Sequence, residues 1–189
     1  MEWIYRLLIP AIWLIFLIYW WVRSAGVKRA DRVEAAAMGY VRAAMIWGAA
    51  VLMGTSLESH LLACRLWPRS PVSYWIGVLI LVSGLLFAVQ ARRHLAGNWS
   101  QSVTIKQDHE LITSGPYRFA RHPIYTGILT GFLGTAIVIA EVHAVLSLAL
   151  MTLALWIKLR LEEVWMREHF GESYTEYSRR VAALIPGLL

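Results

Sequence analysis

The 189-residue sequence has little charge and few of the residues that build soluble cofactor or metal sites. Only 16% of its residues are charged and 58% are hydrophobic, whereas soluble domains carry about 25% charged residues. The single cysteine, Cys64, excludes an internal disulfide and a cysteine-based metal cluster. Since the six histidines form no H-x-x-H or H-x-x-x-H pair, we expect no zinc site and no other metal partner.

Glycine spacing excludes another class of protein. No two of the 13 glycines are separated by one residue, so the G-x-G-x-x-G fingerprint of soluble dinucleotide-binding folds is absent. A glycine-rich phosphate-binding loop is absent as well. Any cofactor is therefore expected between hydrophobic helices and their short connections, because the polar remainder is too short for a separate nucleotide-binding domain.

Long hydrophobic runs make up most of the chain. A membrane-spanning helix needs about 20 apolar residues, and lipid offers no hydrogen-bond partners to an open backbone. We therefore predict an all-α integral membrane bundle, formed as a single domain over residues 1–189. Five transmembrane helices are expected, at residues 3–22, 35–57, 72–91, 124–140 and 142–157. The last two are predicted to form a tight hairpin that continues into a cytosolic helical extension.

Basic residues predict the orientation of these spans. The net charge is +6, and most lysines and arginines follow spans one, three and five. The positive-inside tendency then places the N-terminus outside and the C-terminus in the cytosol, across the inner membrane if the source is prokaryotic. The expected partner is the lipid bilayer and not nucleic acid, because positive loops account for the charge. Arg42 lies inside span two, where it either has a function or snorkels to the boundary.

Two polar stretches on the predicted cytosolic side carry most of the ionisable groups. The first ends in a Gly-Pro turn at Gly115 and in the run Arg121-His122-Pro123-Ile124-Tyr125. Pro123 suits the first turn of a helix. The N-terminus of that helix, with Arg121 and His122 beside it, favours binding of a carboxylate. The alternative interpretation is a well-capped helix with an interfacial arginine and tyrosine.

The second polar stretch follows span five. Spacings of 4, 3 and 4 residues place four side chains on one helix face, namely those of Lys158, Glu162, Trp165 and His169. Carboxylates this close to hydrocarbon are costly unless a partner or a ligand cation meets them. The hairpin brings both polar stretches together, which predicts one site built from both. The alternative interpretation of the second stretch is a solvated helix with surface ion pairs. Gly171 is expected to end the helix.

These motifs, in this order, resemble the isoprenylcysteine carboxyl methyltransferase family, which is related to the membrane phospholipid methyltransferases. The resemblance covers about residues 92–186 and rests on short pieces: Ser114–Tyr117, Arg121–Tyr125, Glu162-Glu163, Phe170-Gly171-Glu172-x-Tyr174, Tyr177, Val181 and Pro186. It implies transfer of a methyl group from S-adenosyl-L-methionine, bound at the cytosolic face by the last two spans and their flanking loops.

The resemblance also implies roles for individual residues. The cofactor-binding positions of the family fall on His109, Glu110, Leu111, Ile112, Tyr117, His122, Pro123, Ile124, Tyr125 and Glu162, or Glu163 in its place. Arg121 joins this set through its effect on the helix N-terminus. The family's substrate-binding arginine falls on Lys158, a point charge instead of a planar fork, so Arg160 is the alternative. We thus expect Lys158, Arg160, Glu162 and Glu163 to carry the catalytic roles.

The function that this resemblance implies is carboxyl O-methylation of an isoprenylcysteine-type acceptor, lipid-like or prenylated. A carboxylate nucleophile needs no base, whereas an amine must first lose a proton, for example to Glu162 or Glu163. N-methylation of an aminophospholipid is the alternative within the same chemistry, although the Gly-x-Gly cofactor motif of that branch is absent. A non-catalytic membrane sensor or partner-binding subunit is the alternative from another class.

Overall fold

The structure, a computed structural model, describes residues 2–23, 30–33, 35–54, 61–95, 104–106 and 111–185. Helices make up most of these ranges: α1 (Glu2–Val22), α2 (Ala36–Gly54), α3 (Pro71–Leu95), α4 (Pro123–Ile139), α5 (Val142–Phe170) and α6 (Glu172–Arg180). A 3₁₀ helix, η2 (Gly115–Arg118), precedes α4. Among the described residues, an antiparallel ribbon of β1 (Ala30–Val33) and β2 (Thr104–Lys106) departs from the all-α prediction.

The described helices have the lengths and surfaces of an integral membrane protein. By length and composition, α2, α3 and α5 are each able to cross a bilayer, whereas the apolar parts of α1 and α4 are shorter. Large apolar side chains face outward along the bundle, among them Leu14, Ile15, Trp47, Leu79 and Leu86. Water-soluble proteins seldom expose so many, so this surface is suited to lipid.

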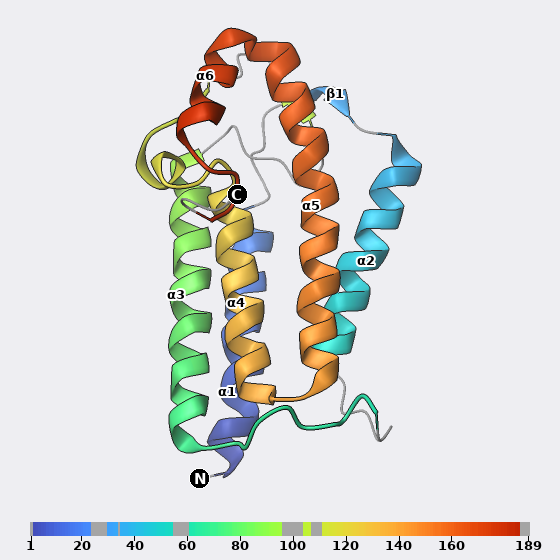
Figure 1. Cartoon of the computed structure of the whole chain (residues 1–189), viewed down its shortest axis with the longest axis vertical. Helices are drawn as coiled ribbons and strands as arrows, with labels where there is room; N and C mark the ends of the chain where they lie inside the picture. Colours follow the sequence, from blue (N-terminus) through green and yellow to red (C-terminus); the bar gives the residue numbers. More distant parts are fainter. Residues whose placement is uncertain are drawn as a thin grey trace.

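The helices stand side by side along the long axis of the molecule (Figure 1). Only Ala140 and Glu141 separate α4 from α5, and the two helices run in opposite directions. At 29 residues, α5 is about 43 Å long, which exceeds the roughly 30 Å hydrocarbon core. Its last turns extend beyond α4, and α6 folds back over that end (Figure 1). The prediction that helix five continues past its apolar part is therefore confirmed.

Backbone contact between α3 and α4 fixes the position of α4. Gly84 on α3 faces Gly127 on α4, and Gly77 faces Gly134 one heptad away. A Cβ atom on Gly84 would lie 2.7 Å from the Gly127 carbonyl oxygen, and one on Gly127 would lie 2.5 Å from that of Gly84. Small residues allow membrane helices to approach until their backbones touch. Glycine is required here by this close approach.

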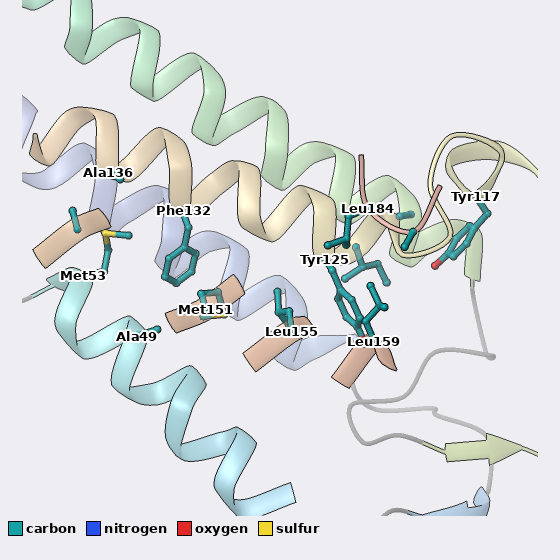
Figure 2. Packing of buried hydrophobic residues seen from close by; sticks show 14 residues of the cluster. Ala49, Met53, Tyr117, Tyr125, Phe132, Ala136, Met151, Leu155, Leu159 and Leu184 are labelled. Atoms are coloured by element: carbon teal, nitrogen blue, oxygen red, sulfur yellow. The ribbon is translucent and has the colours of Figure 1, made fainter. Parts of the chain in front are cut away.

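The interior is apolar. It is formed by residues of α2, α4, α5 and the C-terminal segment, which comprises residues 181–185 after α6. Figure 2 shows residues of this cluster, among them Met53, Phe132, Met151, Leu155 and Leu184. Two hydrogen bonds between helices fix their registers across it. The Trp13 indole of α1 donates to Thr135 Oγ1 of α4 at 3.0 Å, and Ser147 Oγ of α5 donates to the Ala49 carbonyl of α2 at 2.6 Å.

Replacing Gly127 by valine should destabilise the bundle, because the added side chain meets backbone atoms of α3. Overpacking costs about 1–3 kcal/mol, which lowers the melting temperature by roughly 2–12 °C at this chain length. Thermal unfolding of the detergent-solubilised protein, followed by circular dichroism, measures the change. Gly54→Val is the matched control, since a Cβ atom there meets nothing within 4 Å. Equal melting temperatures for the two variants would contradict the contact.

Candidate functional site

The two polar stretches that the sequence singled out meet at one end of the bundle. The Tyr125 hydroxyl, in the first turn of α4, donates to the Glu162 carboxylate and lies 2.7 Å from each of its oxygens. His122 Nδ1 lies 3.4 Å from Glu162 Oε2. His122 Nε2 lies 3.5 Å from Glu163 Oε1. Residues 37 positions apart in the chain are thus in contact, as the hairpin of the last two spans predicted.

The local sequence explains why His122 and Tyr125 point toward α5. His122 is the N-cap of α4 and Pro123 is its first residue, as predicted. The His122 ring stacks on the Tyr125 ring, with centroids 5.3 Å apart and planes 9° from parallel. The C-terminal segment holds this turn from the other side, because the backbone N–H of His122 donates to the Ala183 carbonyl and Thr126 Oγ1 donates to the Leu184 carbonyl.

The Glu163 carboxylate accepts hydrogen bonds from two arginines. Arg121 Nε donates to Glu163 Oε1 at 2.7 Å, and Arg167 Nη2, four residues along α5, donates to Oε2 at 2.7 Å. Arg121 also donates to the backbone carbonyls of Ser178 and Val181. One carboxylate therefore joins the loop before α4, the extension of α5 and the C-terminal segment. The Glu163 side chain is 6% exposed, whereas that of Glu162 is 23% exposed.

Of the two candidate substrate cations, the structure brings Lys158 to the site and not Arg160. Lys158 Nζ lies 3.8 Å from Glu162 Oε1 and 5.4 Å from the centroid of the Tyr125 ring. Two residues along a helix rotate a side chain by about 200°, so Arg160 lies on the other side of α5. There it is exposed, with its guanidinium 6.0 Å from the centroid of the Trp156 ring.

Four further predicted cofactor residues are buried or half-buried. Tyr117 is buried in η2, and its carbonyl accepts a hydrogen bond of 2.6 Å from the Tyr177 hydroxyl. Ile124 is buried, and Ile112 packs against the core cluster. Leu111 is half-buried. The predicted cofactor residues His109 and Glu110 lie outside the described part of the chain.

Arg42 is a buried residue of α2 whose role the sequence left open. Its relative exposure is 6%. Its burial places the guanidinium inside the bundle and away from the lipid-facing surface. The available sequence signal was a single charge within an apolar run, which marks candidate functional residues in membrane spans.

The neighbouring charges determine which ionised forms the site favours. Burial alone would lower the pKa of His122, but the carboxylates of Glu162 and Glu163 raise it above 6.5. Burial raises the pKa of Tyr177 to about 12. Burial and the nearby Glu162 charge also raise the pKa of Tyr117. The site thus combines neutral tyrosines with a histidine that favours its charged form, an arrangement that suits a small molecule with both acidic and cationic groups.

Comparison with known proteins identifies relatives among membrane methyltransferases. A profile of the phospholipid methyltransferase family matches residues 72–173. Over 144 residues, the chain is 29% identical to a probable protein-S-isoprenylcysteine O-methyltransferase of Oryza sativa subsp. indica, covering 71% of this chain and 73% of the relative. It is 30% identical over 129 residues to the protein-S-isoprenylcysteine O-methyltransferase of Homo sapiens, covering 64% of this chain and 44% of the relative.

The fold is similar to a solved structure of the eukaryotic intramembrane Ras methyltransferase ICMT (isoprenylcysteine carboxyl methyltransferase), with a TM-score of 0.52 and 23% sequence identity. The similarity covers 82% of this chain and 55% of that chain. This chain therefore spans little more than half the length of the solved structure, and the likeness concerns the arrangement of helices.

The charge state of His122 predicts a pH-dependent contribution to stability. Because its pKa is raised, the contribution is fully present below pH 6.5 and is lost as the pH rises through the higher pKa of the folded state. We therefore expect the melting temperature of the unmodified protein to approach that of His122→Gln as the pH rises above 6.5. Thermal unfolding of both proteins in one detergent measures the difference; a gap that is constant with pH would refute the assignment.

Proposed function

We propose that this chain, which belongs to the phospholipid methyltransferase family, transfers the methyl group of S-adenosyl-L-methionine to the carboxylate of a prenylcysteine-type, lipid-like acceptor. The observation that carries the proposal is the Tyr125–Glu162–Lys158 cluster, which lies where the apolar part of α5 ends. Two of the chain's relatives are named protein-S-isoprenylcysteine O-methyltransferases, and those names describe methylation of such a carboxylate.

The site residues fit this cofactor. S-Adenosyl-L-methionine supplies an electrophilic methyl group on a positively charged sulfur. The free N–H groups at the start of α4, with the charged His122 beside them, suit the carboxylate of its amino-acid part. His122 Nε2 faces Glu163 Oε1 at 3.5 Å, so His122 acts on that carboxylate through its charge. Ile112, Tyr117 and Ile124 supply apolar and aromatic surface for the adenosyl part.

Glu162, and not Glu163, is the carboxylate that we assign to the cofactor. Both Glu163 oxygens already accept hydrogen bonds from arginines. Glu162 is the more exposed of the two, and Tyr125 holds its carboxylate in place. It therefore faces either the cationic end of the cofactor or the ribose hydroxyls, while Glu163 has a structural role.

The transfer itself is a direct displacement. An oxygen lone pair of the acceptor carboxylate forms a bond to the methyl carbon, the C–S bond breaks, and its electron pair stays on sulfur. The products are a methyl ester and a neutral thioether, and no proton moves. The chain's own residues therefore act by alignment and by excluding water. Alignment of reactants contributes about 7–11 kcal/mol in well-oriented systems, and Lys158 lies where it can hold the acceptor carboxylate.

N-methylation of an aminophospholipid is the second candidate, because the matching family profile is described by phospholipid methylation. An ammonium acceptor must first lose its proton to a base. Glu163 is engaged by two arginines, and Glu162 is held by Tyr125 close to Lys158. The cations around both carboxylates make them poor bases and repel an ammonium group, so the site favours an anionic acceptor.

The proposal includes the membrane topology. We place α1 to α5 across the bilayer, with the N-terminus outside and the C-terminus in the cytosol, as the distribution of basic residues predicts. A prokaryotic chain would lie in the inner membrane. The site is then at the cytosolic face, where the water-soluble methyl donor is found, and a lipid-like acceptor reaches it from within the bilayer.

A methyl-transfer assay tests this function. The purified protein in lipid vesicles receives S-adenosyl-L-methionine with a tritiated methyl group, together with either an S-prenylcysteine or an aminophospholipid. We expect label in the prenylcysteine, released as methanol by base, because esters hydrolyse and N-methyl groups do not. Label only in base-stable phospholipid would establish the second candidate instead. Cofactor binding without transfer to either acceptor would establish a non-catalytic sensor.

Glu162→Gln should lower kcat/KM for the cofactor by about 10- to 100-fold, as expected for loss of a charge-assisted contact. Glu176→Gln makes the same change at an exposed position of α6 and should leave kcat/KM unchanged. Initial rates at several cofactor concentrations measure the effect. If the two variants behaved alike, our assignment of Glu162 would be wrong.

A further inference from the structure

His94 is a polar residue in the last turn of α3 that the reaction described so far does not use. Its Nε2 atom and Ser114 Oγ form a hydrogen bond of 2.8 Å. Its ring also stacks on the Tyr117 ring, with centroids 6.4 Å apart and planes 25° from parallel. One side chain of α3 thus contacts both the N-cap residue of η2 and the tyrosine that η2 carries.

The turn at Gly115 leaves room for the His94 ring. Gly115 has a φ angle of +59°, which favours glycine. A Cβ atom at this position would lie 2.8 Å from His94 Cε1 and 2.9 Å from each of the two ring nitrogens. Any other side chain at position 115 would therefore displace the ring. The imidazole thus lies directly against the backbone of the turn that begins η2.

Ser114 departs from the usual behaviour of a helix N-cap residue. A serine at an N-cap commonly accepts a hydrogen bond from a backbone N–H of the first turn, but Ser114 makes no such side-chain bond. Its hydroxyl forms the hydrogen bond with His94 instead. A local capping contact is thus replaced by a contact with another helix. Departures of this kind from local rules are expected at functional sites.

Tyr117 connects the His94 contact with the candidate site. Its carbonyl accepts a hydrogen bond of 2.6 Å from the Tyr177 hydroxyl of α6. Its side chain is buried, and Figure 2 shows it at the same end of the bundle as Tyr125. Burial and the charge of Glu162 raise the pKa of Tyr117. The two neighbouring helices therefore hold Tyr117 by its ring and by its backbone, within the electrostatic influence of the carboxylate that we assign to the cofactor.

We propose that His94 is a positioning residue of the cofactor site, which holds Ser114 and the Tyr117 ring so that η2 receives the adenosyl part of S-adenosyl-L-methionine. This inference rests on the proposed function, in which Tyr117 supplies surface for that part of the cofactor. His94 then acts on binding of the methyl donor, and neither on the acceptor nor on the displacement. Its loss should raise the KM for the cofactor and leave kcat and the KM for the acceptor unchanged.

The test measures binding of S-adenosylhomocysteine, the product form of the cofactor, by calorimetry, together with initial rates of methyl transfer. In His94→Ala we expect the dissociation constant and the cofactor KM to rise about 3- to 10-fold, as for loss of one hydrogen bond. His94→Gln keeps a group that can hydrogen-bond to Ser114 and should recover part of the affinity. Arg93→Gln, at the neighbouring exposed position of α3, is the matched control and should bind like the unmodified protein.

Double-mutant cycles show whether His94 acts through η2. His94→Ala should weaken S-adenosylhomocysteine binding by a smaller factor when Ser114→Ala or Tyr117→Leu is already present, because part of the contact is then missing. A full effect in both backgrounds would overturn the inference. If Tyr117→Leu does not fold, the cycle with Ser114→Ala decides. If His94→Ala does not fold, Ser114→Ala alone decides, because it removes the same hydrogen bond and should raise only the cofactor KM.

A purely structural role of His94 gives a different kinetic result. In that case His94→Ala lowers kcat while the cofactor KM stays unchanged, or raises the KM for cofactor and acceptor alike, and the inference is overturned. Failure of the proposed function is seen in the unmodified protein instead. If that protein binds S-adenosylhomocysteine but methylates no prenylcysteine, the proposed reaction is wrong, and the calorimetric comparison of the His94 variants still decides whether His94 positions the cofactor site.

Discussion

Two adjacent carboxylates just beyond the apolar part of α5 set the main constraint on this structure. Glu162 and Glu163 follow the apolar part of α5 within about two turns, and a carboxylate near hydrocarbon is costly without partners. Arg121 meets Glu163 and Tyr125 meets Glu162. Because both partners belong to the start of α4 or the loop before it, the constraint joins the two ends of the α4–α5 hairpin into one site.

Under the proposed function, Glu163 holds the site together and Glu162 contacts the ligand. Glu163 uses both oxygens to connect α5 with Arg121, which in turn contacts the C-terminal segment. The glycine contacts between α3 and α4 position the other side of the site at backbone level. Glu162 is then held by a neutral tyrosine and remains partly exposed. In the proposed site, Glu163 and the glycine contacts keep the helices in place, and Glu162 is the carboxylate that faces the ligand.

Most helices were predictable from the lengths of the apolar runs. The contact between Tyr125 and Glu162 was predictable because a two-residue connection makes α4 and α5 run side by side. The β1–β2 ribbon was not, since strands of four and three residues carry too little pattern to detect. The side of α2 that Arg42 occupies was also undetermined, because a helix with apolar residues all round gives no direction for its core face. The rotation between residues along a helix, once α5 was placed, showed that Lys158 and not Arg160 lies beside Glu162.

The most direct test of one shared site is a structure of the protein in a lipid nanodisc with bound S-adenosylhomocysteine. We predict that the amino-acid part of this molecule lies at the start of α4, with its sulfur beside Tyr125 and Glu162 and open toward Lys158. A nucleoside bound elsewhere in the bundle, out of contact with both Tyr125 and Glu162, would contradict it.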